Sequence, residues 1–211
     1  TLGSCFAVTA HAYAKQGGMN KRKAAEDFYF LNKIMTLGNY NEINNTCVYP
    51  SPRMSKRVPF GTGASVAKYV LNNEESLLSY NPEVFKIIKD FLSRINDIYC
   101  HAYEDKRSFL SNEDECLIKF FEKENFNEVI DECLKNSKNL DTFKKRFFYW
   151  FNGLKILQFI HFAHEEYFNK VPVNISSANL LKMYYNIDTD YHNPVDILLK
   201  YREIQRKRNS I

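Results

Sequence analysis

The chain has 211 residues, of which 45% are hydrophobic and 26% are charged, and it contains 17 Phe and 14 Tyr. So many aromatic side chains must be buried, which excludes long disordered stretches and predicts one sizeable core or two small ones. The formal net charge of +4 is too mild for a nucleic-acid-binding surface, which usually needs a concentrated basic face. We therefore expect no nucleic-acid partner.

The cysteines lack the spacing of metal or redox sites, which predicts a reducing compartment, the cytoplasm. The opening run Thr1-Leu2-Gly3-Ser4 has neither the charged lead nor the apolar stretch of a signal peptide. The chain also starts without Met, on a strand-like segment that needs neighbouring strands, so we expect it to be the carboxyl-terminal part of a longer protein. The basic tail at 202–208 is interpreted as a solvated helix end, with peripheral contact to anionic lipid as the alternative.

The first third of the chain holds most of the glycines and consists of short elements. We expect a strand at about 4–9 and a short helix at about 10–16, which ends at Gly17-Gly18 because glycine tolerates the left-handed conformation. A second helix is expected at about 24–37. A strand-like stretch at 42–49 and a loop at 50–63 complete this segment.

The remainder of the chain has helical periodicity. Helices are expected at about 82–102, from a capped start at 111–114 to 123, at 126–134, at 141–168, from a Ser176 cap to 185, and at 194–206. The apolar stretch at 147–163 is too short and too interrupted to span a bilayer. The predicted fold is α+β and mostly α-helical: residues 1–65 with a small incomplete sheet, followed by a helical domain at 66–211.

The acidic pair Glu26-Asp27 is the first candidate for catalysis. Asp27 stands in the first turn of its predicted helix and shares a face with Phe30, Leu31 and Ile34. An acid beside an apolar stripe is costly unless it is paired or used, and the helix dipole favours its charged form. A carboxylate that is both ionised and partly shielded suits a general base. The alternative from spacing alone is that both acids only decorate the helix N-terminus.

The loop at 50–63 is the second candidate. Arg53, Lys56 and Arg57, with Gly61 and Gly63, could gather a phosphate-bearing ligand, because guanidinium groups and bare backbone amides both suit phosphate oxygens. The alternative is a solvated connector that its prolines stiffen.

Two other patterns suggest metal binding more weakly. His161 and His164, with the distant His192, could serve a metal-dependent hydrolase, but the His-Glu-x-x-His pattern is missing and His161 lies on an apolar face. Structural histidines are the favoured interpretation. The acidic spacing of Asp188-Thr189-Asp190 matches that of nucleotide-metal sites, yet turn chemistry explains it better.

Three runs in order resemble the second half of a family 2 glycosyltransferase domain. They are Gly3-Ser4-Cys5-Phe6-Ala7-Val8, then Tyr13 through Gly17-Gly18-Met19-Asn20, then Ala25-Glu26-Asp27-Phe28-Tyr29-Phe30-Leu31. In that family a strand with small residues, a helix ending in Gly-Gly and an acidic pair opening the next helix follow one another. The run from Tyr49 to Gly63 is similar to a segment that follows the acidic pair in a bacterial subset of the family.

The resemblance implies an inverting transferase in which Asp27 of the Glu26-Asp27 pair is the general base. It implies a nucleotide-sugar donor and a glycan or lipid-linked acceptor. It also implies a divalent metal, Mg²⁺ or Mn²⁺, held by a donor-binding half that this chain does not contain, so no cofactor is expected in this segment. The Gln-x-x-Arg-Trp signature of processive synthases is missing. The alternative function is a helical protein-interaction module without enzymatic activity.

Overall fold

The structure is a computed structural model that describes residues 5–21, 25–43, 45–46, 48, 67, 71, 77–101, 110 and 113–207. The chain divides into two compact units. The first combines residues 1–77 with 181–211, and the second runs from Leu78 to Leu180. Among the described residues, no helix combines the length and the apolar character that crossing a bilayer takes. The predicted class, mostly helical with a small sheet, is confirmed.

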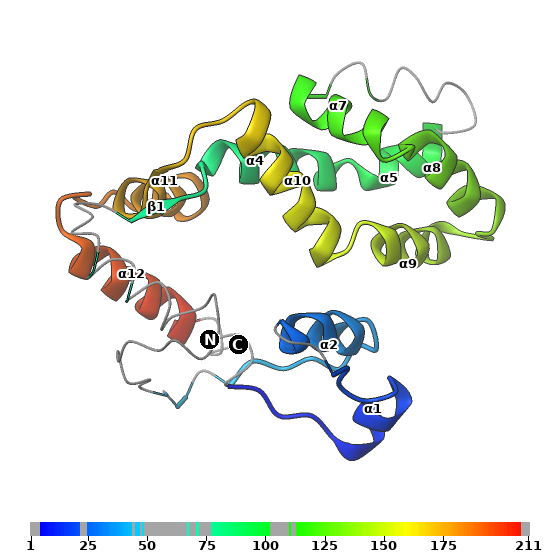
Figure 1. Cartoon of the computed structure of the whole chain (residues 1–211), viewed down its shortest axis with the longest axis horizontal. Coiled ribbons are helices and arrows are strands. Elements are labelled where there is room, and N and C mark those ends of the chain that lie inside the picture. The colour runs from blue at the N-terminus through cyan, green and yellow to red at the C-terminus, as the bar shows by residue number, and fades with distance from the viewer. Residues whose placement is uncertain are drawn as a thin grey trace. The chain divides into compact units, whose positions relative to one another are not determined.

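The amino-terminal part of the first unit contains two helices, α1 (Ala10–Lys15) and α2 (Glu26–Met35), as Figure 1 shows in blue. Thr9 caps α1, because its side-chain oxygen accepts a hydrogen bond from the amide of Ala12 at 3.2 Å. Both helices lie where the sequence predicts them. The strand expected at 4–9 is wrong, since residues 6–9 have no regular secondary structure.

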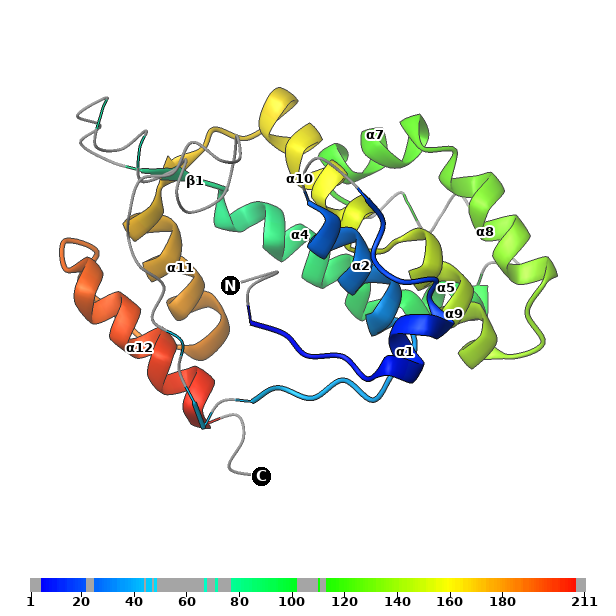
Figure 2. The ribbon, with the colours of Figure 1, turned by 60° about the horizontal axis from the view of Figure 1, so that its bottom comes forward.

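The second unit is a bundle of helices that follow one another in a ring of contacts. Each helix packs on the next: α4 on α5, α5 on α9, α9 on α8, α8 on α7, α7 on α10, and α10 back on α4. Figure 1 shows α10 crossing α4, and Figure 2 shows the same ring after a turn of 60° about the horizontal axis. The helices are α4 (Pro82–Ser93), α5 (Ile95–His101), α7 (Glu115–Lys123), α8 (Phe126–Lys135), α9 (Leu140–Trp150) and α10 (Gly153–Glu166).

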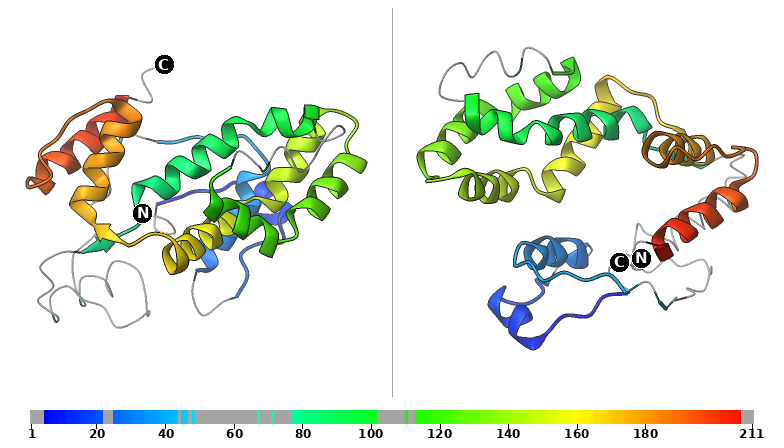
Figure 3. Two further views of the ribbon diagram at one scale, coloured as in Figure 1. Left: turned by 90° about the horizontal axis from the view of Figure 1, so that it is seen from above. Right: turned by 180° about the vertical axis from the view of Figure 1, so that it is seen from behind.

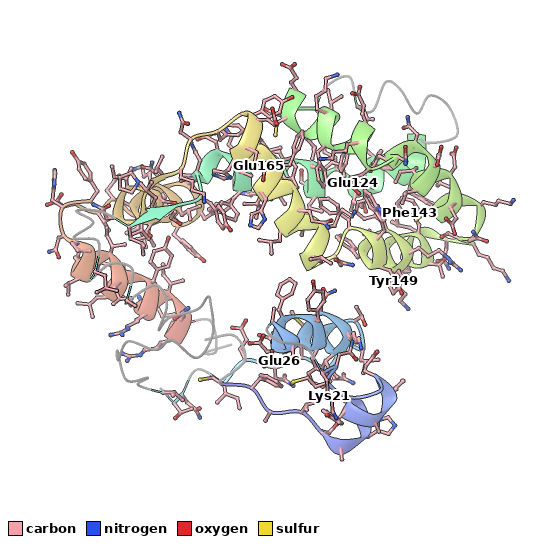
Figure 4. The ribbon with its side chains drawn as sticks, viewed as in Figure 1. Lys21, Glu26, Glu124, Phe143, Tyr149 and Glu165 are labelled. Carbon is pink, nitrogen blue, oxygen red and sulfur yellow. The ribbon has the colours of Figure 1, made fainter. Side chains whose placement is uncertain are left out.

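The centre of the ring is a core rich in phenylalanine. The ring of Phe91 on α4 packs against four other phenylalanine rings, with the shortest centroid distance, 4.9 Å, to Phe121 of α7. On α9 the side chain of Phe143 is fully buried, whereas Tyr149 is exposed, so the helix has one core face and one solvent face (Figure 4). Burial of these rings stabilises the unit through apolar area and edge-to-face contacts. The fully buried phenylalanines of the bundle are Phe91, Phe120, Phe121, Phe143, Phe147, Phe151 and Phe159.

Two helices that the sequence presents as continuous are each broken in the structure. The stretch expected at 82–102 divides at Arg94, after Ser93, whose hydroxyl donates to the carbonyl of Asp90 at 2.7 Å and so competes with the helical hydrogen-bond pattern. The stretch expected at 141–168 divides at Phe151 and Asn152. The Oδ1 atom of Asn152 accepts from the amides of Leu154 and Lys155 at 2.9 and 3.2 Å, and thereby caps α10 as a new helix.

An ion pair joins the break at Arg94 to the residues just before α7. The guanidinium of Arg94 pairs with the carboxylate of Glu113, which precedes α7 and is almost fully buried. The start of α7 is capped by Asp114, whose Oδ1 accepts from the amide of Cys116 at 2.9 Å. The capped start predicted at 111–114 is therefore confirmed at its last residue.

The sheet of the described residues lies in the second unit, so the prediction that places it within residues 1–65 is wrong for the part of that segment that the structure describes. Strands β1 (Leu78–Ser79) and β2 (Val171–Pro172) pair antiparallel, with Leu78 opposite Pro172. Helix α11 (Val173–Tyr185) begins directly after β2. Ser176, predicted as its cap, instead lies inside the helix and is buried, and its hydroxyl donates to the carbonyl of Tyr80 at 2.8 Å. The helix therefore starts at Val173, before the predicted cap, and the Ser176 hydroxyl binds the chain just after β1 rather than the helix end.

Helix α11 ends at a left-handed residue, and α12 (Pro194–Lys207) follows after a polar loop. Asn186 has φ +53°, and its amide donates to the carbonyl of Lys182 at 3.1 Å, an arrangement that terminates helices. The start of α12 is set by Asn193, whose Oδ1 accepts from the amide of Asp196 at 3.1 Å. The sequence predicts both helix ends correctly. Figure 3 shows these two helices from above and from behind.

Candidate functional site

The position of the acidic pair Glu26-Asp27 depends on the turn between α1 and α2. Two consecutive glycines end α1 in the left-handed region, with φ +68° at Gly17 and +71° at Gly18. The amide of Gly18 donates to the carbonyl of Tyr13 at 2.9 Å, which closes the helix end. Because only glycine adopts two such conformations in succession without strain, the Gly-Gly pair fixes the direction in which the chain leaves α1.

A small aromatic cluster then ties α2 to α1. The side chain of Phe30 is only 2% exposed, and its ring centroid lies 5.2 Å from that of Tyr13 and 6.1 Å from that of Phe6. Lys33, one turn further along α2, donates to the side-chain oxygen of Asn20 at 3.4 Å. The first residues of the segment, the turn and both helices are thus held by one set of contacts, which positions the start of α2.

Glu26 and Asp27 form the first turn of α2, and both side chains are partly buried (Figure 4 labels Glu26). Ala25 precedes them in the left-handed conformation, with φ +60°. The Oδ1 atom of Asp27 accepts a hydrogen bond from the amide of Phe28 at 2.7 Å. That bond orients the carboxylate at the positive end of the helix dipole, where a negative charge is favoured. Asp27 lies three residues before Phe30, on the side of α2 that meets α1.

The second candidate lies outside the described residues. Arg53, Lys56, Arg57, Gly61 and Gly63, predicted to bind phosphate, all fall within the stretch 49–66, so their relation to Asp27 stays a prediction. Within the described ranges, no three His, Cys, Asp or Glu side chains gather as a metal site.

His161 and His164 have structural partners that the sequence analysis did not identify. The amide of Asn81 donates to Nε2 of His164 at 2.8 Å, and Nδ1 of the same ring lies 2.7 Å from the carbonyl of Ile160. Nε2 therefore accepts and Nδ1 carries the proton. Nε2 of His161 lies 3.0 Å from the hydroxyl of Tyr80. The two histidines of α10 thus anchor the segment between β1 and α4 in the bundle.

The other acidic pattern also has a structural explanation. The carboxylate of Asp188 pairs with Lys182 at 2.6 Å, and Oδ1 of Asp190 accepts from the amide of His192 at 2.9 Å. An aspartate that binds the amide two residues onward stabilises a turn, as the sequence predicts for this loop.

Comparison of the chain with protein-family models, with curated proteins and with solved structures found no match. The functional argument therefore depends on the sequence resemblance and on the geometry of residues 5–35.

Proposed function

We propose that this chain supplies the acceptor side of an inverting, nucleotide-sugar-dependent glycosyltransferase of family 2, with Asp27 as its general base. The observation that carries the proposal is the order of the helix closed by Gly17-Gly18 and the next helix opened by Glu26-Asp27. A solvated pair of acids would need no such support. Here an aromatic cluster and a left-handed turn hold the start of α2 in place.

The chemistry in this proposal is a single displacement. The carboxylate of Asp27 accepts the proton of the acceptor hydroxyl while that oxygen bonds to the anomeric carbon of the donor sugar. The bond from the anomeric carbon to the nucleotide diphosphate breaks on the opposite face, so the configuration inverts and the diphosphate leaves with the bonding electrons. The amide of Phe28 binds Oδ1 of Asp27, so in this proposal the other carboxylate oxygen, Oδ2, accepts the proton.

Other parts of the site belong to the same proposal. The resemblance assigns the divalent metal, which offsets charge on the leaving diphosphate, to the donor-binding half. Arg53, Lys56 and Arg57 would face the same developing charge as positioned cations. We place the enzyme in the cytoplasm, where nucleotide sugars and reduced thiols coexist. Cys5, Cys100, Cys116 and Cys133 do not form disulfides in the structure.

The test is the variant Asp27→Asn in a protein that carries the donor-binding half. Asparagine keeps an Oδ1 atom that can accept from the Phe28 amide, so the variant removes proton acceptance and preserves the local hydrogen bond. We expect transfer to the acceptor to fall by about 100-fold or more, the lower range for loss of a general base, with donor affinity unchanged. Asp90→Asn, an exposed acid on α4, is the matched control and should transfer at the wild-type rate.

Near-normal transfer by Asp27→Asn would refute the role of Asp27. If the upstream sequence also lacked a nucleotide-binding region with an Asp-x-Asp motif, the interaction-module alternative would replace the enzyme proposal. Circular dichroism of both variants checks that the helices are intact.

A further inference from the structure

Helix α12 has two opposite faces that differ in burial. On one face Ile197 is 3% exposed, and burial together with the nearby Tyr185 raises the pKa of the Tyr201 hydroxyl. On the opposite face Val195 and Leu199 are 64% and 53% exposed, and Leu198, at the edge of that face, is 49% exposed. A helix that only covered a core would place polar side chains on its outer face. Two exposed aliphatic side chains on that face, with a third at its edge, therefore need another explanation.

The same outer face changes from apolar to basic along its length. At 100° per residue, Val195, Leu199, Arg202 and Arg206 lie within about 60° of one another on a stripe opposite Ile197, and Leu198 lies at the edge of this stripe, about 100° from Ile197. Both arginines are exposed. The stripe thus presents aliphatic groups in the first half of α12 and guanidinium groups in the second.

The carboxylate of Glu203, beside this stripe, forms ion pairs with two lysines. Glu203 pairs with Lys200 at 3.7 Å and with Lys207 at 2.7 Å, and these pairs lower the pKa of its carboxyl. A hollow of about 360 Å³ lies along this helix, lined by Leu199, Arg202, Glu203, Arg206 and Lys207. The positive charge beside the aliphatic groups is therefore available to an anionic partner.

We propose that the outer stripe of α12 docks on an anionic lipid bilayer. Aliphatic side chains at one end enter the boundary between headgroups and acyl chains, while guanidinium groups bind lipid phosphates in their forked geometry. Apolar groups beside cations complement a bilayer surface, which offers both apolar depth and negative charge, better than they complement a free phosphate, which offers charge alone. This docking is independent of Asp27, so it can hold or fail whether or not the chain belongs to a transferase.

The experiment is flotation of the whole chain with vesicles of phosphatidylcholine alone or mixed with phosphatidylglycerol. We expect binding to the mixed vesicles that weakens as salt is added, because surface electrostatics are screened. Replacement of both arginines, Arg202→Gln with Arg206→Gln, should lower the partition coefficient by about 30-fold, since each basic residue near an anionic surface contributes about a factor of five. Leu198→Ser with Leu199→Ser should lower it by at least about tenfold through lost apolar burial.

The control variant removes two positive charges from the helical bundle instead of from α12. Lys138→Gln with Lys145→Gln replaces two exposed lysines of the bundle and should bind as the wild type does. Equal binding of the arginine variant and this control, equal binding to neutral vesicles, or wild-type binding by the leucine variant would each overturn the proposal. Inorganic phosphate that abolishes vesicle binding where sodium chloride of the same ionic strength does not would assign the arginines to a free anion and also overturn the proposal. Circular dichroism spectra that match the wild type keep these outcomes interpretable.

Discussion

The aromatic ring of Tyr13 lies against Gly18 so closely that a Cβ atom built on the glycine would come within 2.9 Å of ring carbon Cε1. Gly17, its neighbour, has nearly the same backbone conformation, yet a Cβ there would meet no atom within 4 Å. The two glycines therefore separate two effects that usually occur together, backbone strain and steric contact.

Gly17→Ala should destabilise the segment by about 1 kcal/mol, the typical penalty of a left-handed conformation for a residue with a Cβ. Gly18→Ala should lower the free energy of unfolding further, by about 2 kcal/mol or more, because the Tyr13 ring, which packs on Phe30, must also move. Urea unfolding, monitored by circular dichroism, measures both changes. Adding Tyr13→Ala to each variant should reduce the difference between their free energies of unfolding. An equal loss of stability in the two single variants would contradict the contact between Gly18 and Tyr13.

His164→Phe tests the hydrogen bonds of the histidine that anchors the β1–α4 segment. Phenylalanine keeps the ring but leaves the part-buried amide of Asn81 without its acceptor, so we expect the free energy of unfolding to fall by about 1–3 kcal/mol. His161→Phe is the matched change one turn earlier. It loses only a contact to the Tyr80 hydroxyl at an exposed position and should change stability by no more than about 0.5 kcal/mol. A larger loss of stability in His161→Phe than in His164→Phe would show that the Tyr80 contact is the more important anchor.

The Cys116 thiol should make stability depend on alkaline pH. Burial, with a smaller effect of the Asp114 carboxylate, raises its pKa from the ordinary value of 9.0 to about 12. Between these values the unfolded chain loses this proton while the folded protein keeps it, so the free energy of unfolding falls as pH rises from 9 to 12. Cys116→Ala should show a shallower decline than the wild type in urea titrations over that range. Identical slopes would exclude a contribution from this thiol.

The sequence predicts helix existence well where a local signal sets it. The Gly-Gly pair after α1, Asp114 before α7 and Asn193-Pro194 before α12 each mark an end that depends on neighbouring residues alone. The sequence does not predict the breaks at Arg94 and Asn152, because the apolar periodicity continues through them. Asn152 has the chemistry of a helix cap, but the aromatic residues on both sides of it continue the helical pattern.

The errors concern contacts between distant residues. Ser176 has the local chemistry of a helix cap, but its partner is the carbonyl of Tyr80, 96 residues away. Tyr80 and Asn81 give no local sign that they meet His161 and His164. For the candidate site, the sequence predicts the place of Asp27 at the start of α2, whereas the aromatic contacts of Phe30 that hold this start come from tertiary packing.

The ring of helices in the second unit closes where its first helix, α4, meets its last, α10. Just outside this point β1 pairs with β2, so the chain enters and leaves the bundle through adjacent strands. The residues before Leu78 and after Leu180 belong to one compact unit, which makes the bundle an insertion within a discontinuous partner. A module attached through two neighbouring strands can be excised, exchanged or circularly permuted without rerouting the rest of the polypeptide.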